Sequence, residues 1–144
     1  MQKKHMFKTG LAGMAAAMAL VAAPIASAAA TPTVTVRVVG KTKTLLATKT
    51  VHTKSGWITR GGVAAGKCPA TSAQGALNVA THGNWKGSWY ASYREYFITG
   101  ILGDNETSKK YYWGLYVNGK LASKGACLIK LKTGDKLLFR VTKS

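Results

Sequence analysis

The sequence contains few acidic residues and few of the side chains on which hydrolytic catalysis depends. Its 144 residues include 21 Lys and Arg but only four Asp and Glu. The acids form no paired-carboxylate motif, and no G-x-S-x-G segment supplies a nucleophile elbow. His52 and His82 are the only histidines beyond residue 28, and they lack metal-ligand spacing. We therefore predict a protein that is not an enzyme and has no metal ligands, with a small secreted hydrolase as the weakest alternative.

Long apolar runs are also scarce, and the only one lies near the N-terminus. Three lysines precede an apolar segment over residues 11–23, Pro24 follows it, and residues 26–28 read Ala-Ser-Ala. This layout is typical of a secretory signal peptide with its cleavage site. A membrane anchor is the alternative, but the run is short for a span of about 20 residues. We predict a signal peptide over residues 1–28, a single domain over 29–144 with no transmembrane segment, and a secreted, extracellular location.

Cysteine occurs only twice, at Cys68 and Cys127. An even pair in a small exported domain usually forms a disulfide. Closing a loop of about 60 residues would stabilise the fold by roughly 4 kcal/mol in the chain-entropy model. The alternative is that Cys68 is a nucleophile and His82 its base, but Cys127 would then have no role. We predict a Cys68–Cys127 disulfide.

Positive charge dominates the predicted mature chain. The formal net charge is +17, and removing the three lysines of residues 1–28 leaves +14. Such a chain is attracted to polyanions, so anionic cell-envelope polymers or another envelope protein are the expected partners. Only four of the basic residues are arginines, at positions 37, 60, 94 and 140. An Arg guanidinium can bind a phosphate group through two parallel hydrogen bonds, whereas a Lys ammonium is a hydrated point charge. A surface rich in Lys therefore favours diffuse attraction of polyanions. The alternative is that the lysines only keep the protein soluble.

One helix is indicated between the two cysteines. Thr71 and Gln74 have capping-box spacing, which predicts Thr71 as N-cap and Gln74 at the third helical position. Alanines and a leucine then recur at helical spacing to residue 80 and form one apolar face. Gly83 is a natural residue to follow the helix end. Gly75 inside the helix would allow close packing on a sheet.

Strand patterns surround this helix. Valines alternate with polar residues over 33–38, and residues 43–52 follow a turn, so the chain opens with a hairpin. Residues 96–102, 111–117 and 137–142 predict further strands, and Asn-Gly at 118–119 is a strong hairpin signal. The order predicts an α+β fold that is β-grasp-like, with one helix packed on a mostly antiparallel sheet and one disulfide.

Aromatic residues supply the candidate binding site. Alternation along 111–117 directs Trp113 to one face of the sheet and Tyr112 and Tyr116 to the other. We predict that Tyr112 and Tyr116, flanked by Trp85, form a stacking surface that suits sugars, corrins or nucleobases. The alternative is that these rings pack on a strand face for structural reasons.

Four segments together resemble a family of bacterial exported domains of unknown function. They read TSAQGALNVA, GSWYASYREYFITGILG, YYWGLYVNGK and LKTGDKLLF, and the resemblance covers residues 32–142. This family is similar to the C-terminal domain of transcobalamin and intrinsic factor, which implies a β-grasp-like fold. In those proteins the small domain closes over one side of the corrinoid, while a large helical domain, absent here, holds most of the ligand.

Two function hypotheses follow from these observations. The first is an exported, non-enzymatic binding or adhesion module that acts at or outside the cell envelope on an unidentified small molecule or polymer. The second, implied by the resemblance alone, is a corrinoid-binding accessory domain, with cobalamin as its ligand. The residues themselves indicate no cofactor.

Overall fold

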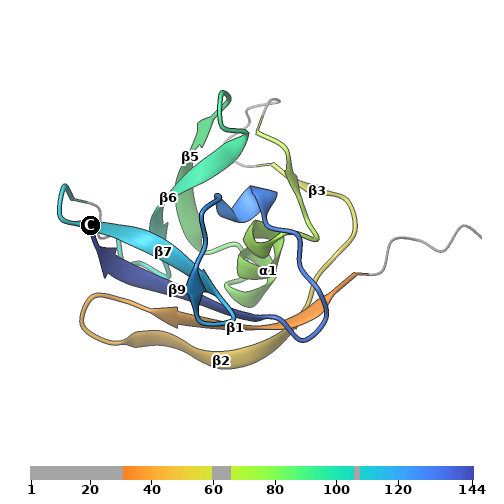
Figure 1. The fold of residues 1–144 in the computed structure, drawn as a ribbon, viewed down its shortest axis with the longest axis horizontal. Helices are drawn as coiled ribbons and strands as arrows, with labels where there is room; N and C mark the ends of the chain where they lie inside the picture. The colour runs from red at the N-terminus through yellow and green to blue at the C-terminus, as the bar shows by residue number, and fades with distance from the viewer. Residues whose placement is uncertain (1–30, 60–65, 106–107) are drawn as a thin grey trace, which may run out of the picture.

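The computed structural model describes residues 31–59, 66–105 and 108–144 (Figure 1). The predicted signal peptide, residues 1–28, lies outside them. The elements, in chain order, are β1 (Thr33–Val39), β2 (Thr44–His52), β3 (Trp57–Ile58), β4 (Cys68–Pro69), α1 (Ala73–Ala80), β5 (Trp85–Tyr90), β6 (Glu95–Ile101), β7 (Tyr111–Val117), β8 (Lys120–Leu121), the 3₁₀ turn η1 (Ala126–Leu128) and β9 (Lys136–Lys143). The predicted α+β class, with one helix and mostly antiparallel strands, is therefore confirmed for the part of the chain that is described.

A five-stranded sheet with the order β2-β1-β9-β7-β8 forms one side of the molecule. The predicted hairpins are present as the antiparallel pairs β1–β2 and β7–β8. The last strand, β9, lies between them, parallel to β1 and antiparallel to β7. Asn118 and Gly119 both have positive φ, as a tight hairpin turn requires.

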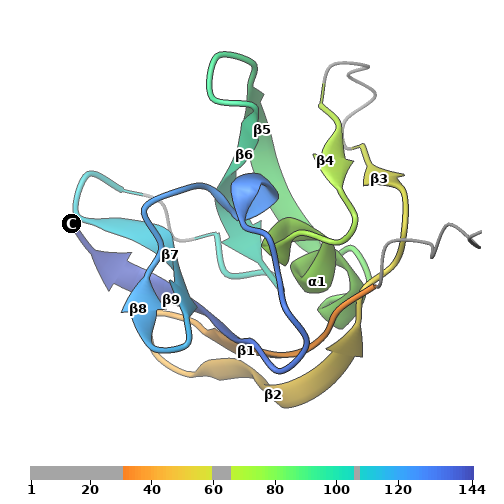
Figure 2. The same ribbon diagram turned by 45° about the vertical axis from the view of Figure 1, so that its right-hand side comes forward.

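The inner face of this sheet carries the core that alternation predicts. Val34, Val36 and Val38 of β1 are buried, as are Leu137 and Phe139 of β9. Their polar neighbours on the same strands lie on the outer face, because successive side chains of a strand point to opposite sides. The inner face packs on helix α1, which lies between the sheet and the β5–β6 hairpin in both views (Figures 1 and 2).

The helix begins one residue later than predicted. Ser72, not Thr71, is the N-cap, and its hydroxyl oxygen accepts a hydrogen bond from the Gly75 N–H at 3.3 Å. The same hydroxyl donates to the Pro69 carbonyl at 2.6 Å, which ties the helix start to β4. Gln74 is therefore at the second helical position, and its buried side-chain amide has no hydrogen-bond partner in the described structure. The predicted capping box is wrong.

The helix ends in a Schellman arrangement. The Gly83 N–H donates to the Asn78 carbonyl at 2.8 Å, and the His82 N–H donates to Val79 at 3.2 Å. His82, one residue before the predicted Gly83, adopts the left-handed conformation directly after the C-cap, with φ of 52°. Gly75 also has a different role from the expected one: a Cβ there would overlap the backbone of Ala70, in the turn before the helix, and not a sheet.

The β5–β6 hairpin covers the helix from the other side. Trp85 is only 1% exposed, and its indole N–H donates to the Asn78 side-chain oxygen at 2.9 Å. Tyr96 packs edge-on against both Trp85 and Trp89, with ring centroids 5.2 Å and 4.9 Å apart. The prediction of a strand near residues 96–102 is confirmed, whereas its partner strand, β5, was not predicted. The sequence suggested one sheet, but the strands of the described residues divide into three sheets.

The predicted disulfide joins Cys68 of β4 to Cys127 of η1, with the Cα atoms 5.3 Å apart. Cys68 is fully buried and Cys127 nearly so. The bridge connects the segment before the helix to the segment before β9, across 59 residues of sequence. The alternative role of Cys68 as a free nucleophile is therefore excluded.

Candidate functional site

The outer face of the five-stranded sheet collects basic side chains that are far apart in the sequence. Arg37 lies opposite Leu138 in the β1–β9 pairing, and Tyr116 lies opposite Leu138 in the β7–β9 pairing. These three residues therefore form one row across the sheet. Lys136 and Arg140 lie two residues to either side of Leu138, on the same face, because alternate residues of a strand share a face.

A hollow of about 460 Å³ lies over this row. We call it the open-face hollow; the described residues that line it are Thr35, Arg37, Thr48, Tyr116, Gly119, Lys136, Leu137, Leu138 and Arg140. Three of these are cationic and none is acidic. The Arg37 guanidinium donates a long hydrogen bond, 3.4 Å, to the Thr44 hydroxyl. Guanidinium groups in such a setting are well suited to phosphate, sulfate or carboxylate oxygens.

The one carboxylate next to these cations in the sequence is already engaged. Asp135 accepts from the Asn118 side-chain amide at 3.0 Å and from the Lys132 N–H at 2.8 Å. Both bonds hold the turn that leads into β9. The positive potential of the open-face hollow is therefore not cancelled by a neighbouring acid among its lining residues.

Tyr116 forms an aromatic wall of the hollow. Its hydroxyl lies 3.2 Å from the Thr142 hydroxyl, and Thr142 pairs with Tyr112, four residues back along β7. The Tyr116 side chain therefore extends along β7 past Gly114. A Cβ at Gly114 would lie 2.6 Å from the Thr142 hydroxyl oxygen, so a larger residue there would disturb this contact.

The structure brings together only part of the predicted stacking surface. Tyr112 and Tyr116 are half-buried and lie on the face of β7 opposite to buried Trp113, as alternation requires. Tyr112 does not line the open-face hollow but borders a separate groove between β6 and β7. Trp85 belongs to the β5–β6 hairpin, pairs with Ile101 and is buried. It therefore does not flank the two tyrosines, and ligand contact by any of the three residues stays a prediction.

Arg37, Lys136 and Arg140 were not singled out from the sequence. The available signal was that Arg37 lies between Val36 and Val38, and Arg140 between Phe139 and Val141, so each arginine faces away from a core position. That pattern shows that each faces outward on its own strand. It does not show that β1 and β9 are neighbours, which is what makes the arginines converge.

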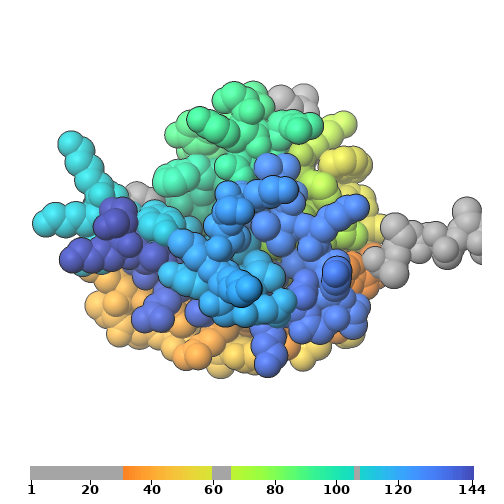
Figure 3. Space-filling model, in the orientation of Figure 1, coloured from red at the N-terminus to blue at the C-terminus, as the bar shows by residue number. Residues whose placement is uncertain are grey.

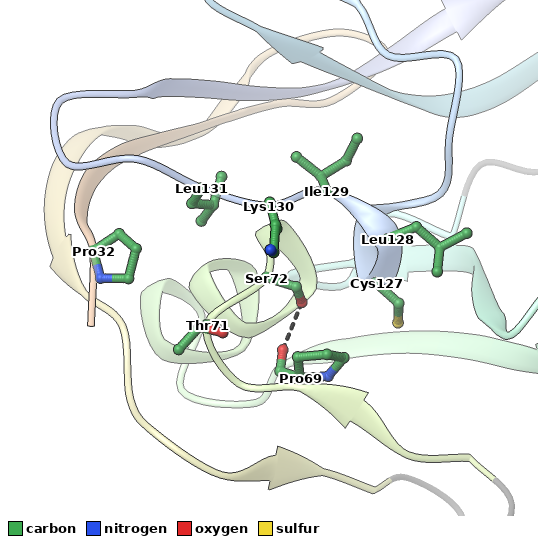
Figure 4. A pocket seen from close by; sticks show the side chains of 9 residues that line it. All are labelled: Pro32, Pro69, Thr71, Ser72, Cys127, Leu128, Ile129, Lys130 and Leu131. Carbon is green, nitrogen blue, oxygen red and sulfur yellow. Dashed lines mark hydrogen bonds between the residues drawn. The ribbon is translucent and has the colours of Figure 1, made fainter. Parts of the chain in front are cut away.

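A second hollow, of about 390 Å³, lies beside the helix start and the disulfide (Figure 4). Its lining is mostly apolar, and Lys130 is its one charged residue. The Ser72 hydroxyl in its wall is occupied by the Pro69 carbonyl and the Gly75 N–H. With one charged residue against the three of the open-face hollow, this hollow offers an anionic ligand less.

Within residues 31–59, 66–105 and 108–144, no group of three or more His, Cys, Asp or Glu side chains lies close enough to hold a metal ion. In the same part of the chain, no helix is both long and apolar enough to cross a membrane.

Comparison with known proteins places the chain among domains without an assigned activity. The family model described as "Domain of unknown function (DUF4430)" matches residues 71–143, about half of the chain. No curated protein matches the sequence.

Solved structures share the fold. A crystal structure of haptocorrin in complex with Cbi superposes with a TM-score of 0.55 at 19% identity, covering 78% of this chain but only 25% of haptocorrin. A candidate metal-binding protein from Ruminococcus gnavus ATCC 29149 superposes with a TM-score of 0.53 at 15% identity, covering 78% of this chain and 98% of that protein. The predicted resemblance to a transcobalamin-type domain is confirmed at the level of fold.

Proposed function

Since the chain belongs to the DUF4430 family, whose description assigns no activity, we propose a function from the geometry of its open face. The protein is a non-enzymatic, exported binding or adhesion module that acts at or outside the cell envelope. Its ligand is an anionic polymer whose phosphate, sulfate or carboxylate groups enter the open-face hollow.

One observation carries this proposal: Arg37, Lys136 and Arg140 converge on one hollow with no acid in its lining. The hollow also has an apolar floor at Leu138 and an aromatic wall at Tyr116. Anionic groups would pair with the guanidiniums, while a sugar ring or other apolar part of the polymer would lie on the floor and wall. A surface that served only solubility would not need this combination.

Export is supported by two independent features. The N-terminal sequence has the layout of a signal peptide, and Cys68 and Cys127 form a disulfide. Disulfides persist in oxidising compartments outside the cytosol. The β-grasp assignment belongs to the same proposal, and the sheet order β2-β1-β9-β7-β8 with β1 and β9 parallel supports it.

A corrinoid-binding accessory domain is the second candidate. The fold shared with haptocorrin, which was crystallised in complex with Cbi, favours it. The chain spans only a quarter of haptocorrin, so corrinoid binding by this domain needs a test of its own. Titrating cobinamide into the protein and following its visible absorption tests this candidate separately.

The main proposal is tested by binding to an immobilised anionic polymer, such as heparin or wall teichoic acid, over a range of salt concentrations. We expect Arg37→Ala combined with Arg140→Ala to weaken binding and to lower the slope of log affinity against log salt by about two. Both arginines are exposed, so the variant should fold normally.

A matched control removes the same charge elsewhere. Lys109 and Lys110 are exposed and do not line the open-face hollow. Lys109→Ala combined with Lys110→Ala should reduce binding much less than the arginine pair does. Equal losses in the two double variants would mean that the attraction is diffuse, and the open-face hollow would then have no special role.

A further inference from the structure

The tip of the β5–β6 hairpin exposes three aromatic rings around one carboxylate. Tyr90, Tyr93 and Phe97 are 49%, 66% and 48% exposed, and Glu95 lies among them. The hairpin stands at the upper edge of the molecule in Figure 3, where its residues are coloured green. We call this group the tip cluster. It shares no lining residue with the open-face hollow.

The hairpin holds these rings in place although they contribute little to the core. Trp89 and Tyr96 are cross-strand partners that face inward. Tyr90 and Phe97, each the next residue along its strand, therefore face outward. The Tyr93 N–H donates to the Tyr90 carbonyl at 3.2 Å, which closes the turn between the strands. The tip is therefore a built structure that presents aromatic rings to solvent.

The geometry of the tip cluster is that of a corner. The Tyr90 and Phe97 rings are nearly perpendicular, at 84°, with centroids 6.3 Å apart. Tyr93 extends from the turn beside them. Together with Glu95 these residues line a hollow of about 200 Å³. Perpendicular rings offer a bound group the electron-rich face of one ring and contact with the other.

Glu95 supplies a negative charge that the surrounding protein does not satisfy fully. It is one of only four acidic residues in a chain with 21 Lys and Arg. Its Oε2 atom is buried and has no hydrogen-bond partner in the described structure. That oxygen packs so closely on Gly125 that a Cβ at residue 125 would overlap it. Because Glu95 also lines the hollow of the tip cluster, a cation there would offset part of the cost of holding this carboxylate away from water.

We propose that the tip cluster binds a quaternary ammonium group, as found in choline-containing ligands. Such a cation is attracted to the faces of aromatic rings and needs no hydrogen-bond acceptor, so an aromatic corner with one carboxylate is well suited to it. The preference is opposite in sign to that of the open-face hollow, because the tip cluster is lined by an acid and no base. This inference does not rest on the proposed function.

The test uses choline chloride and its uncharged isostere dimethylbutanol, in which carbon replaces the quaternary nitrogen. Each is titrated into the full, folded chain while backbone amide NMR shifts are recorded. We expect choline to give saturable shifts in residues 90–97 and dimethylbutanol to give weak, non-saturating ones. Equal responses to both would reduce the tip cluster to a general apolar patch, and no response to choline would end the proposal.

Two variants assign the effect to ring and charge. Tyr93→Leu and Glu95→Gln should each weaken choline binding by about five- to tenfold. Tyr93 is exposed in a turn, so its replacement should leave the melting temperature unchanged. The Tyr93→Leu variant therefore still tests the proposal if Glu95→Gln disturbs folding. Unchanged choline affinity in Tyr93→Leu would refute the proposal.

Trp57→Leu is the matched control. Trp57 is 65% exposed, like Tyr93, but lies in β3 and does not line the hollow. This variant should bind choline as the unmodified chain does. A loss equal to that in Tyr93→Leu would contradict a localised site. N-acetylglucosamine is titrated in parallel, and saturable shifts in residues 90–97 with the sugar but not with choline would assign the tip cluster to carbohydrate instead.

Discussion

The five-stranded sheet and the β5–β6 hairpin are alike on their inner faces and different on their outer faces. Each turns apolar side chains toward the helix: valines and Phe139 from the sheet, Trp85 and Tyr96 from the hairpin. On the outside, the sheet shows cations around Leu138, whereas the hairpin shows aromatic rings around Glu95. Core packing requires apolar side chains on the inner faces. It places no such requirement on the outer faces, whose residues can therefore differ. The outer faces are therefore where we expect binding.

The largest expected effect comes from removing a large side chain from an inner face, which tests whether inner and outer faces contribute differently to stability. Trp85→Ala should lower the free energy of unfolding by about 3–5 kcal/mol, because the indole is buried and bonded to Asn78. Phe97→Ala, on the outer face of the same hairpin, should cost less than about 1 kcal/mol. Chemical denaturation measures both. Similar losses would show that the two faces of the hairpin are not distinct.

Removing the disulfide tests whether the segment before the helix and the segment before β9 are held together mainly by the covalent bond or by packing. Replacing Cys68 and Cys127 together by Ser should lower the free energy of unfolding by about 2–5 kcal/mol. Thermal unfolding with and without reductant provides the measurement, and intact-mass analysis of the unmodified chain confirms the bridge. A reductant that left the melting temperature of the unmodified chain unchanged would count against this estimate.

The smallest expected effect sharpens the outer face of the sheet. Tyr116→Phe removes one hydroxyl, whose 3.2 Å contact with Thr142 is half-exposed, and should cost about 0.5–1.5 kcal/mol at most. Binding to an anionic polymer should persist, because the ring remains as a wall of the open-face hollow. If stability fell by several kcal/mol, Tyr116 would be a structural residue, as the alternative interpretation of the sequence held.

Much of the fold was readable from local patterns. Period-2 alternation predicted β1, β7 and β9 because their inner positions hold large apolar residues and their outer positions mostly do not. Strand β5 was missed because Gly87 occupies an inner position between Trp85 and Trp89, and outward Tyr90 adds a further aromatic residue. The helix start moved by one residue because Thr71 and Ser72 are both good N-caps, and the contact of Ser72 with Pro69 decides between them.

The candidate sites depended on information that local patterns do not carry. The disulfide was predictable because only two cysteines were available. The open-face hollow depends on the parallel pairing of β1 with β9. The residue types in these two strands do not predict that they are neighbours. For Trp85 the sequence did not indicate the environment: its indole is buried and its N–H donates to Asn78 inside the core, while a ligand contact by this residue stays a prediction.

The position of β9 has a consequence for the order of folding events. Strand β9, the last of the described strands, is the middle strand of its sheet. Its residue Lys136 pairs with Thr35, which lies about one hundred residues earlier in the chain. Until residues 136–143 are available, the β1–β2 and β7–β8 hairpins have no shared neighbour and cannot join. Pairing strands so far apart in sequence costs loop-closure entropy before the new contacts stabilise the chain, and this slows folding. In a growing chain the two hairpins can therefore join into one sheet only after residues 136–143 have been synthesised.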